Sequence, residues 1–382
     1  AADALAAVDV LEAGRPLTFV HPVVRETIYG DIPPGQRAAM HARAARVLED
    51  AGVSVAERAP HLMATDPSGD PAVVSALREA AEAALGQGAA DLARRYLTRA
   101  LAEPPEGDER AQVLSELGTA EWLAGEPASA SEHLRESVEA TSDPQLRAER
   151  AVTLARAVFY TGQVPQAVDL LEREAERLEG ESGESVDRLR AEIYSLGIIS
   201  ELTIPRVAPR LDALEVPQGR DIGSLLTTAH LGAREWMVGT ADRCYELCRQ
   251  AYAEGLLLES EGMESIAVYE IAWSLTWADR QDLAREITSG LLEQATARGS
   301  VFGHSTARAL GALINYSVGK MTAVEAEARA GIELSEPPAF SRPTLYTLLA
   351  FALIERGAYD EAEEAVRESG CGPFLPPMLH MH

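Results

Sequence analysis

The chain has 382 residues and a formal net charge of −26, because 60 acidic residues outnumber 34 basic ones. This length suits two or three domains or one long repeat array, and the acidic excess argues against a chain that itself grips DNA or RNA. There is no apolar run of about 20 residues and no signal peptide, and Cys244, Cys248 and Cys371 give no disulfide framework, so we expect a cytoplasmic protein without contact to a membrane.

The first 70 residues differ from the rest of the chain. Residues 3–13 predict a helix, and the β-prone residues 15–20 predict a short strand or wing. A second helix is expected to begin at Pro22, where the missing N–H of proline costs nothing, and a third covers residues 36–51. The pair Asp70-Pro71 then supplies an N-cap and a first residue for the next helix.

A repeat begins at about residue 72 and is clearest in residues 117–138. Its turns recur about every 38 residues, close to the period of ~34 of tetratricopeptide repeats, at Gly88, Gly125, Gly162, about Ile204, Gly239, Asp279, Gly319 and Gly357. Small residues stand seven positions before the regular turns, at Ala81, Gly118, Ala155, Gly232, Ala272, Ala312 and Ala350. Small or compact residues stand five positions after them, at Ala93, Ala130, Ala167, Cys244, Ala284, Val324 and Ala362.

Small side chains let two helices approach closely, and glycine permits the positive φ of a turn. The pattern therefore predicts an all-α superhelical solenoid of about eight tetratricopeptide-like helix pairs over residues 72–382. Residues 204–209 break this pattern, because Pro205 and Pro209 stand where a turn and an unbroken helix are expected. That unit is either locally irregular or a hinge at which the superhelix changes direction.

Four segments in the first hundred residues carry a family resemblance. Residues 19–29 are FVHPVVRETIY, and residues 37–45, 59–70 and 94–101 continue the match. Together they resemble large ATP-binding bacterial transcriptional regulators of the LuxR type, similar in layout to the maltose-regulon activator. The resemblance implies that residues 1–70 are a winged-helix-like domain at the end of a STAND-type ATPase module. It also implies that a helix-turn-helix domain follows the superhelix.

The motifs that such regulators use for ATP and DNA binding are absent from this sequence. Gly319-Lys320 lacks the earlier glycine of a phosphate-binding loop and is followed by Met321, and no helix-turn-helix closes the chain. Since the chain starts at Ala1 inside an expected helix and stops abruptly at His382, we expect a piece of a longer protein or a processed one. The resemblance then implies no cofactor here, with ATP bound only by an upstream domain.

Aromatic residues fall at positions that line the concave face of a tetratricopeptide-like array, and Tyr269, Trp273 and Trp277 form one helical stripe there. Aromatic rings stack on sugars, planar rings and apolar peptides. We predict a ligand or partner site formed by Trp122, Phe159, Tyr160, Arg234, Trp236, Tyr269, Trp273, Trp277, Tyr316 and Phe351. Further polar contacts could come from Arg156, His230, Glu235 and Asn315. The alternative is that several of the rings pack between neighbouring repeats.

Other candidate chemistry has simpler interpretations. Cys244 and Cys248, at i and i+4, could hold half of a metal site, but their repeat positions favour buried apolar residues. We assign His21 to the winged-helix core, the C-terminal histidines to a frayed end, and the glutamates of residues 172–181 to a solvated helix face. Because no catalytic motif is present, we expect neither a metal site nor an enzyme.

Together with the repeat pattern, the resemblance implies the sensor region of an ATP-dependent transcriptional activator. A small-molecule inducer, or a protein or peptide partner, would bind in the concave groove and shift the equilibrium of the upstream ATPase and its self-association. One alternative is a tetratricopeptide scaffold for protein interactions without transcriptional output. Another is the regulatory arm of a multidomain cyclase or kinase.

Overall fold

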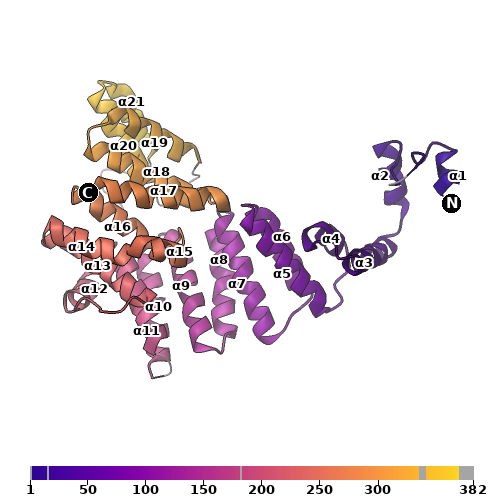
Figure 1. Ribbon diagram of the computed structural model, residues 1–382, viewed down its shortest axis with the longest axis horizontal. Helices are drawn as coiled ribbons and strands as arrows, with labels where there is room; N and C mark the ends of the chain where they lie inside the picture. The colour runs from indigo at the N-terminus through magenta and orange to yellow at the C-terminus, as the bar shows by residue number, and fades with distance from the viewer. Residues whose placement is uncertain (1, 15–16, 181–182, 335–340, 370–382) are drawn as a thin grey trace.

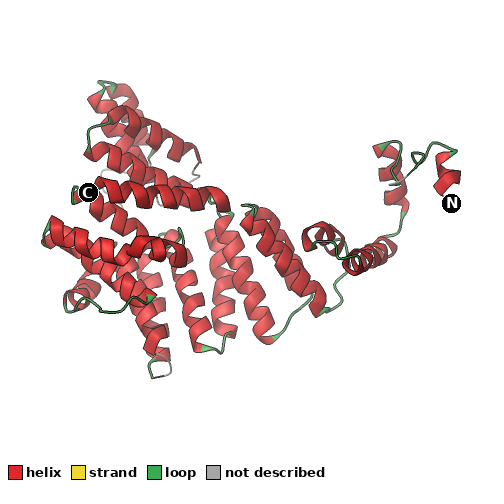
Figure 2. Ribbon diagram, in the orientation of Figure 1, coloured by secondary structure: helices red, strands yellow, loops and turns green. Residues whose placement is uncertain are grey.

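The computed structural model describes residues 2–14, 17–180, 183–334 and 341–369. Within these residues the secondary structure is helical, apart from one isolated antiparallel bridge between Leu11 and Phe19 (Figure 2). Successive helices pair and stack along a curved array (Figure 1). The predicted all-α solenoid is thereby confirmed. None of the described helices is long and apolar enough to cross a membrane.

Eight consecutive helix pairs make up the array within the described residues. They are α5 (Pro71–Gly86) with α6 (Ala90–Leu101), α7 (Gly107–Leu123) with α8 (Pro127–Ala140), α9 (Pro144–Tyr160) with α10 (Val164–Leu178), α11 (Gly183–Gly197) with α12 (Ile204–Asp212), α13 (Ile222–Val238) with α14 (Ala241–Tyr252), α16 (Ile266–Trp277) with α17 (Gln281–Arg298), α18 (Val301–Ser317) with α19 (Met321–Leu334), and α20 (Arg342–Glu355) with α21 (Tyr359–Glu368). Most of the predicted turn residues have positive φ, namely Gly88, Gly125, Gly162, Asp279, Gly319 and Gly357. Gly239 differs, because its φ of −114° lies outside the left-handed region.

The small residues before and after the turns are all buried where the paired helices touch. A Cβ atom on Gly118 would lie 2.6 Å from Cγ of Leu134, and one on Gly232 would lie 2.9 Å from Sγ of Cys248. Because such distances are shorter than van der Waals contact, these pairs depend on the absence of a side chain. Cys244 and Cys248 are fully buried with their sulfurs 3.9 Å apart, as apolar core residues would be.

Four helices precede the array and extend away from it (Figure 1). They are α1 (Ala2–Ala6), α2 (Pro22–Asp31), α3 (Pro34–Asp50) and α4 (Val55–Leu62). The first is shorter than predicted, since Asp9 adopts a left-handed φ of 56° that a helix cannot contain. The expected strand at residues 15–20 is reduced, in the part that the structure describes, to the single bridge at Phe19. The winged-helix assignment stays a prediction.

His21 has a different role from the predicted one. The residue is exposed, and its Nδ1 accepts a hydrogen bond of 3.2 Å from the backbone N–H of Val23, with Pro22 as the first residue of α2. It caps the helix because it satisfies one of the N–H groups that the first turn leaves unpaired. The prediction that it belongs to a core was therefore wrong.

The unit that breaks the sequence pattern folds as a helix pair, α11 with α12, whose second helix is shortened. In α12, which has 9 residues, Pro205 occupies the first turn and Pro209 lies inside the helix. A Cβ atom on Gly197 would lie 2.6 Å from Val207, so the close approach of the two helices is preserved. Arg210 pairs with Glu172 of α10 at 2.8 Å. These contacts favour local irregularity over a hinge, and they make Glu172 part of a helix contact rather than only of a solvated face.

An extra segment interrupts the array between α14 and α16. A short 3-10 turn, η1 (Ala253–Gly255), leads into α15 (Leu256–Glu261). Ala253 and Glu254 have φ values of 48° and 58°, in the left-handed region that residues with a Cβ seldom adopt. Leu257 and Leu258 bury this segment in the main core. The insertion thereby places the end of α15 against helices that precede it by more than 60 residues.

The array curves until its sixth pair meets its first. The backbones of Gly88, after α5, and Gly299, after α17, lie against each other. A Cβ atom on Gly88 would lie 2.9 Å from the backbone nitrogen of Gly299. Both residues have positive φ, which glycine adopts without strain. In Figure 1, α17 correspondingly reaches the helices at the start of the array, and α18–α21 continue beyond the contact.

Candidate functional site

A large cleft lies at the irregular unit. Its volume is about 1050 Å³, and it is lined by α9, α11 and α13 together with the end of α15. The loop that follows the short α12 completes it, with Leu214, Glu215 and Pro217 in its wall. Because α12 ends early, this loop is long enough to reach the face formed by the first helices. The break in the repeat pattern therefore marks the unit that builds the cleft.

Two further clefts continue the same surface. The middle cleft, of about 480 Å³, shares Thr153, Arg156 and Glu261 with the large cleft. The third cleft, of about 550 Å³, shares Glu82 and Thr119 with the middle one. We call this continuous surface along α5, α7, α9, α11 and α13 the inner groove.

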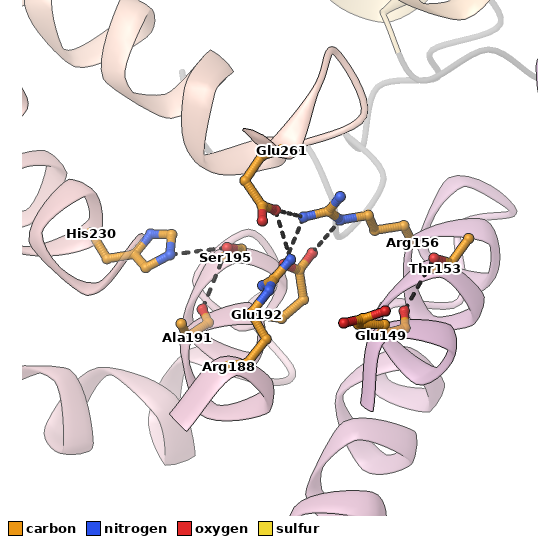
Figure 3. Close-up of polar contacts among 9 residues, drawn as sticks. All are labelled: Glu149, Thr153, Arg156, Arg188, Ala191, Glu192, Ser195, His230 and Glu261. Atoms are coloured by element: carbon orange, nitrogen blue, oxygen red, sulfur yellow. Dashed lines mark hydrogen bonds and ion pairs between the residues drawn. The ribbon is translucent and has the colours of Figure 1, made fainter. Parts of the chain in front are cut away.

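The floor of the inner groove holds four charged side chains where the large and middle clefts meet (Figure 3). Arg156 of α9 donates to both carboxylate oxygens of Glu192 on α11, at 2.7 and 2.9 Å. Arg156 and Arg188 both donate to Oε2 of Glu261 on α15, at 2.7 and 2.6 Å. Arg188 also donates to Glu192 at 3.2 Å. We call Arg156, Arg188, Glu192 and Glu261 the charged quartet.

The electrostatics of the quartet keep Arg156 and Glu192 ionised. Burial alone would raise the pKa of Glu192, but the charge of Arg156 and the hydrogen bonds from Arg156 and Arg188 outweigh it and lower that pKa to about 2. Burial likewise opposes the cation of Arg156, yet the carboxylates of Glu192 and Glu261 raise its pKa. With two arginines and two carboxylates, the quartet has no net charge.

Polar contacts between residues one repeat apart connect the first helices along the array, including Arg156 and Glu192 of the quartet. The partners are between 35 and 40 residues apart in sequence, which is one repeat. These contacts join Arg78 to Glu116, Gln112 to Arg150, Arg156 to Glu192, Ser195 to His230, and His230 to Glu270, at 2.6 to 2.9 Å. Buried polar groups require such partners, so the contacts favour one relative placement of successive repeats.

Ser195, His230 and Glu270 are connected in the order of a catalytic triad. Ser195 Oγ lies 2.9 Å from Nε2 of His230, whose Nδ1 lies 2.6 Å from the Glu270 carboxylate. However, Ser195 is 1% exposed and His230 is fully buried, and neither lines a cleft described above. A nucleophile must reach its substrate, so we assign this relay to the contacts between repeats.

The predicted aromatic site is divided in the structure. Four of its members are at most 9% exposed, namely Trp122, Phe159, Tyr160 and Tyr269. Phe302 of α18 covers three of them, with ring centroids 4.1 Å from Tyr160, 6.0 Å from Trp122 and 6.5 Å from Tyr269. Among the ten predicted residues, only Trp122 lines the inner groove. The closing of the array buries these rings, as the alternative of packing between repeats expected.

Four other predicted residues form an exposed aromatic patch on α16, α18 and α20. Trp273 and Trp277 lie 6.4 Å apart, and Tyr316 stacks on Phe351 at 5.5 Å. Trp273 and Tyr316 pack against the same small apolar cluster, which connects the two ring pairs. Trp277 and Phe351 are each 42% exposed. We call these four residues the aromatic patch.

The remaining predicted residues lie elsewhere. Arg234 pairs with Asp212 at the end of α12, and Trp236 packs partly buried against the main core. Asn315 accepts a hydrogen bond of 3.4 Å from Arg285. Cys371 and the C-terminal histidines lie outside the described residues. Within the residues that are described, no group of three potential metal ligands comes together.

Comparison with known proteins gives only distant similarities. The sequence matches no described protein family and no curated protein. Among solved structures, a tetratricopeptide repeat protein from Parabacteroides merdae is 13% identical, with a TM-score of 0.44, and the alignment covers 74% of this chain and 99% of that one. A STAND protein with a tetratricopeptide repeat sensor from Pyrococcus horikoshii is 15% identical, with a TM-score of 0.37 over 94% of this chain and 56% of that one. This chain therefore spans about half of the archaeal protein's length. Because these similarities are distant, the repeat fold is assigned from the eight helix pairs of the described residues.

Proposed function

We propose that this chain is a binding region that takes up a small effector, or a peptide segment of a protein partner, in the inner groove. The observation that carries the proposal is the groove itself, which runs over five successive repeats and has the most voluminous of its three clefts at the irregular unit. Concave surfaces with a few convergent polar groups are the usual form of binding sites. Helical repeat arrays provide such surfaces because each repeat adds a small rotation.

Trp122 gives a second line of support. Its Nε1 lies buried beside the middle cleft and has no hydrogen-bond partner among the described residues. Buried indole donors are usually paired when the protein is in its working state. A polar group of a bound ligand would supply the acceptor.

The charge of the large cleft indicates which ligands fit. Carboxylates outnumber arginines among its lining residues, which include Glu149, Glu184, Asp187, Glu215, Asp221, Glu261, Arg156, Arg188 and Arg190. A cleft with an excess of one charge attracts ligands of the opposite charge. The proposed ligand therefore carries at least one cationic group.

Blocking the groove tests the proposal. Thr153 lies where the two main clefts meet, so Thr153→Trp should fill the groove. Thr98→Trp is the matched control, because Thr98 is exposed on α6 and both hydroxyls donate to the carbonyl four residues earlier. Small metabolites screened by thermal shift, and a displayed random-peptide library, should yield ligands that bind the wild type and Thr98→Trp but not Thr153→Trp.

A third variant separates the groove from the aromatic patch. The double variant Trp277→Ser and Phe351→Ser changes the two most exposed rings of the patch. Ligands of the groove should bind it as they bind the wild type. If every ligand is lost in the patch variant and kept in Thr153→Trp, the site is the patch and the groove proposal fails.

We further propose that the binding region belongs to an ATP-dependent transcriptional activator of the LuxR type. The support is the sequence resemblance of residues 19–29, 37–45, 59–70 and 94–101. The full gene tests this directly: a phosphate-binding loop upstream and a helix-turn-helix downstream are expected. A full-length protein without either domain would leave a tetratricopeptide-like interaction scaffold as the better account.

A further inference from the structure

Glu261 occupies an unusual position for a structural ion-pair partner. It does not belong to any of the eight helix pairs but ends the inserted helix α15, and it lines both the large and the middle cleft. Its Oε2 receives hydrogen bonds from Arg156 and Arg188, which lie 105 and 73 residues earlier in the chain. A carboxylate thus lies in the groove between two arginines, as the acid group of a bound molecule would (Figure 3).

The other three members of the quartet are held independently of Glu261. Glu192 is fully buried and accepts hydrogen bonds from both arginines, so it fixes their positions from the floor of the groove. Without Glu261 the site would hold two cations and one anion, an excess of one positive charge. A single carboxylate would restore neutrality, and the planar guanidinium groups present donors that match it.

We propose that Arg156 and Arg188 form a subsite for the carboxylate of the groove's ligand, and that Glu261 occupies this subsite when the ligand is absent. This inference rests on the proposed function, since it concerns the same groove. The ligand carries a cationic group as well, because the acidic lining of the large cleft would otherwise repel it. The chemical class is therefore a zwitterion, such as an amino-acid derivative or the C-terminus of a peptide that ends in a basic residue.

Exchange of the two carboxylates would couple binding to the inserted helix. Glu261 competes as a tethered group at high effective concentration, so a free carboxylate binds the wild type weakly. When a ligand displaces Glu261, α15 loses its only described ion pairs to α9 and α11. Its remaining anchors are apolar contacts of Leu257 and Leu258 and a hydrogen bond of 3.2 Å from Gln294 to the Leu258 carbonyl.

Removal of Glu261 tests the subsite with defined probes. The probes are Nα-acetyl-lysine, a hexapeptide that ends in lysine, and the C-terminal amide of each, which differs only in the carboxylate. At constant ionic strength in chloride, both acid forms should raise the unfolding midpoint of Glu261→Ala by about 2–4 °C. The amides should not, and the wild type should respond at least about tenfold more weakly. Whether the small or the peptide acid responds more strongly identifies the source of the carboxylate.

Two further variants complete the test. Glu264→Ala removes a neighbouring acid that lines the middle cleft and pairs with Arg298 at 3.5 Å, so it should show no response to the acids. Arg188→Gln combined with Glu261→Ala should abolish the response, because one of the two donors is lost. If Glu261→Ala is unfolded in chloride, the helicity that each probe restores is measured instead.

Equal effects of acids and amides on Glu261→Ala would overturn the carboxylate subsite. That result would leave the groove proposal intact if Thr153→Trp still abolishes ligand binding. Conversely, a response of Glu261→Ala to acids, with no effect of Thr153→Trp on any ligand, would confine binding to the subsite and refute the proposal that the ligand fills the wider groove.

Discussion

Side-chain volume at the helix crossings matters at several glycines, three of which stand before the turn of a helix pair. Gly118, Gly197 and Gly232 each precede a turn, and a Cβ atom there would lie 2.6, 2.6 and 2.9 Å from the partner helix. Distances this short require movement of Leu134, Val207 or Cys248, all of which are buried. Interiors packed at crystal density accommodate such movement only at a cost in free energy.

Replacement of Gly118 by alanine measures this cost. We expect Gly118→Ala to lower the free energy of unfolding by about 1–3 kcal/mol, because the new methyl group would also lie 3.1 Å from the Ala130 carbonyl oxygen. Gly86→Ala is the control, since Gly86 ends helix α5 with no atom within 4 Å of the added Cβ. The control should keep or raise the stability, by up to about 1 kcal/mol. Urea unfolding curves compare the two, and equal midpoints would contradict the packing argument.

The small residues could be predicted from the sequence, but the charged quartet could not. Spacing identifies Gly118 and Ala130 because helix crossings impose a fixed distance between them. Arg156 and Glu192 are 36 residues apart, and this interval of one repeat was a usable signal. The partner of Arg188 at Glu261, 73 residues away, depends on how the insertion folds back, and no periodicity encodes it.

At the scale of elements, α15 and α12 are the two departures from a uniform array. The short α12 was visible in the sequence through its prolines, although its consequence, a loop that walls the large cleft, was not. The amino-acid composition does not change at α15, and the repeat positions on either side of it, at Gly239 and Asp279, keep their spacing. Three consecutive residues before α15 have positive φ, namely Ala253, Glu254 and Gly255, and only the last is a glycine, so the sequence marks this turn weakly.

A substitution at the left-handed residues before α15 could raise the stability of the protein. Glu254 is exposed with a φ of 58°, so Glu254→Gly should raise the unfolding free energy by about 0.5–1 kcal/mol. Glu259→Gly, at an exposed position inside α15, should instead lower it by about 1 kcal/mol. Thermal unfolding of the two variants beside the wild type checks the opposite signs. Destabilisation by both would mean that the left-handed conformation at Glu254 carries no strain.

At the scale of the whole molecule, the number and period of the repeats could be predicted from the sequence. The contact between the first and the sixth pair, at Gly88 and Gly299, could not. The curvature of the array is the sum of a small rotation at each repeat. The short α12 and the inserted α15 change these rotations, and the spacing of the repeat residues does not show this change. The burial of Trp122 and Tyr160 under Phe302 is a consequence of closure. For this reason several residues of the predicted aromatic site belong to the core of the protein.

We call the contact between Gly88 and Gly299 the closing contact, and a Cβ atom added there should open the array. In Gly299→Ala the added atom would collide with the carbonyl oxygen of Gly88. Gly125 also has a positive φ, of 84° against 63° at Gly299, but no atom lies within 4 Å of a Cβ added there. We expect the first variant to show a larger radius of gyration by small-angle X-ray scattering, with unchanged helical circular dichroism. The second should keep the radius of the wild type. If the two variants scatter alike, the closing contact does not determine the curvature.

The contact between Gly88 and Gly299 also determines how force would pass through the protein. In an open solenoid, tension between the two ends stretches every repeat in series, as in a spring. Here a pull between α4 and α18 has a shorter route, directly across the closing contact and past the pairs from α7 to α16. The six pairs of the closed part would then move as one stiff body, and the inner groove would be shielded from tension on the chain until the contact breaks.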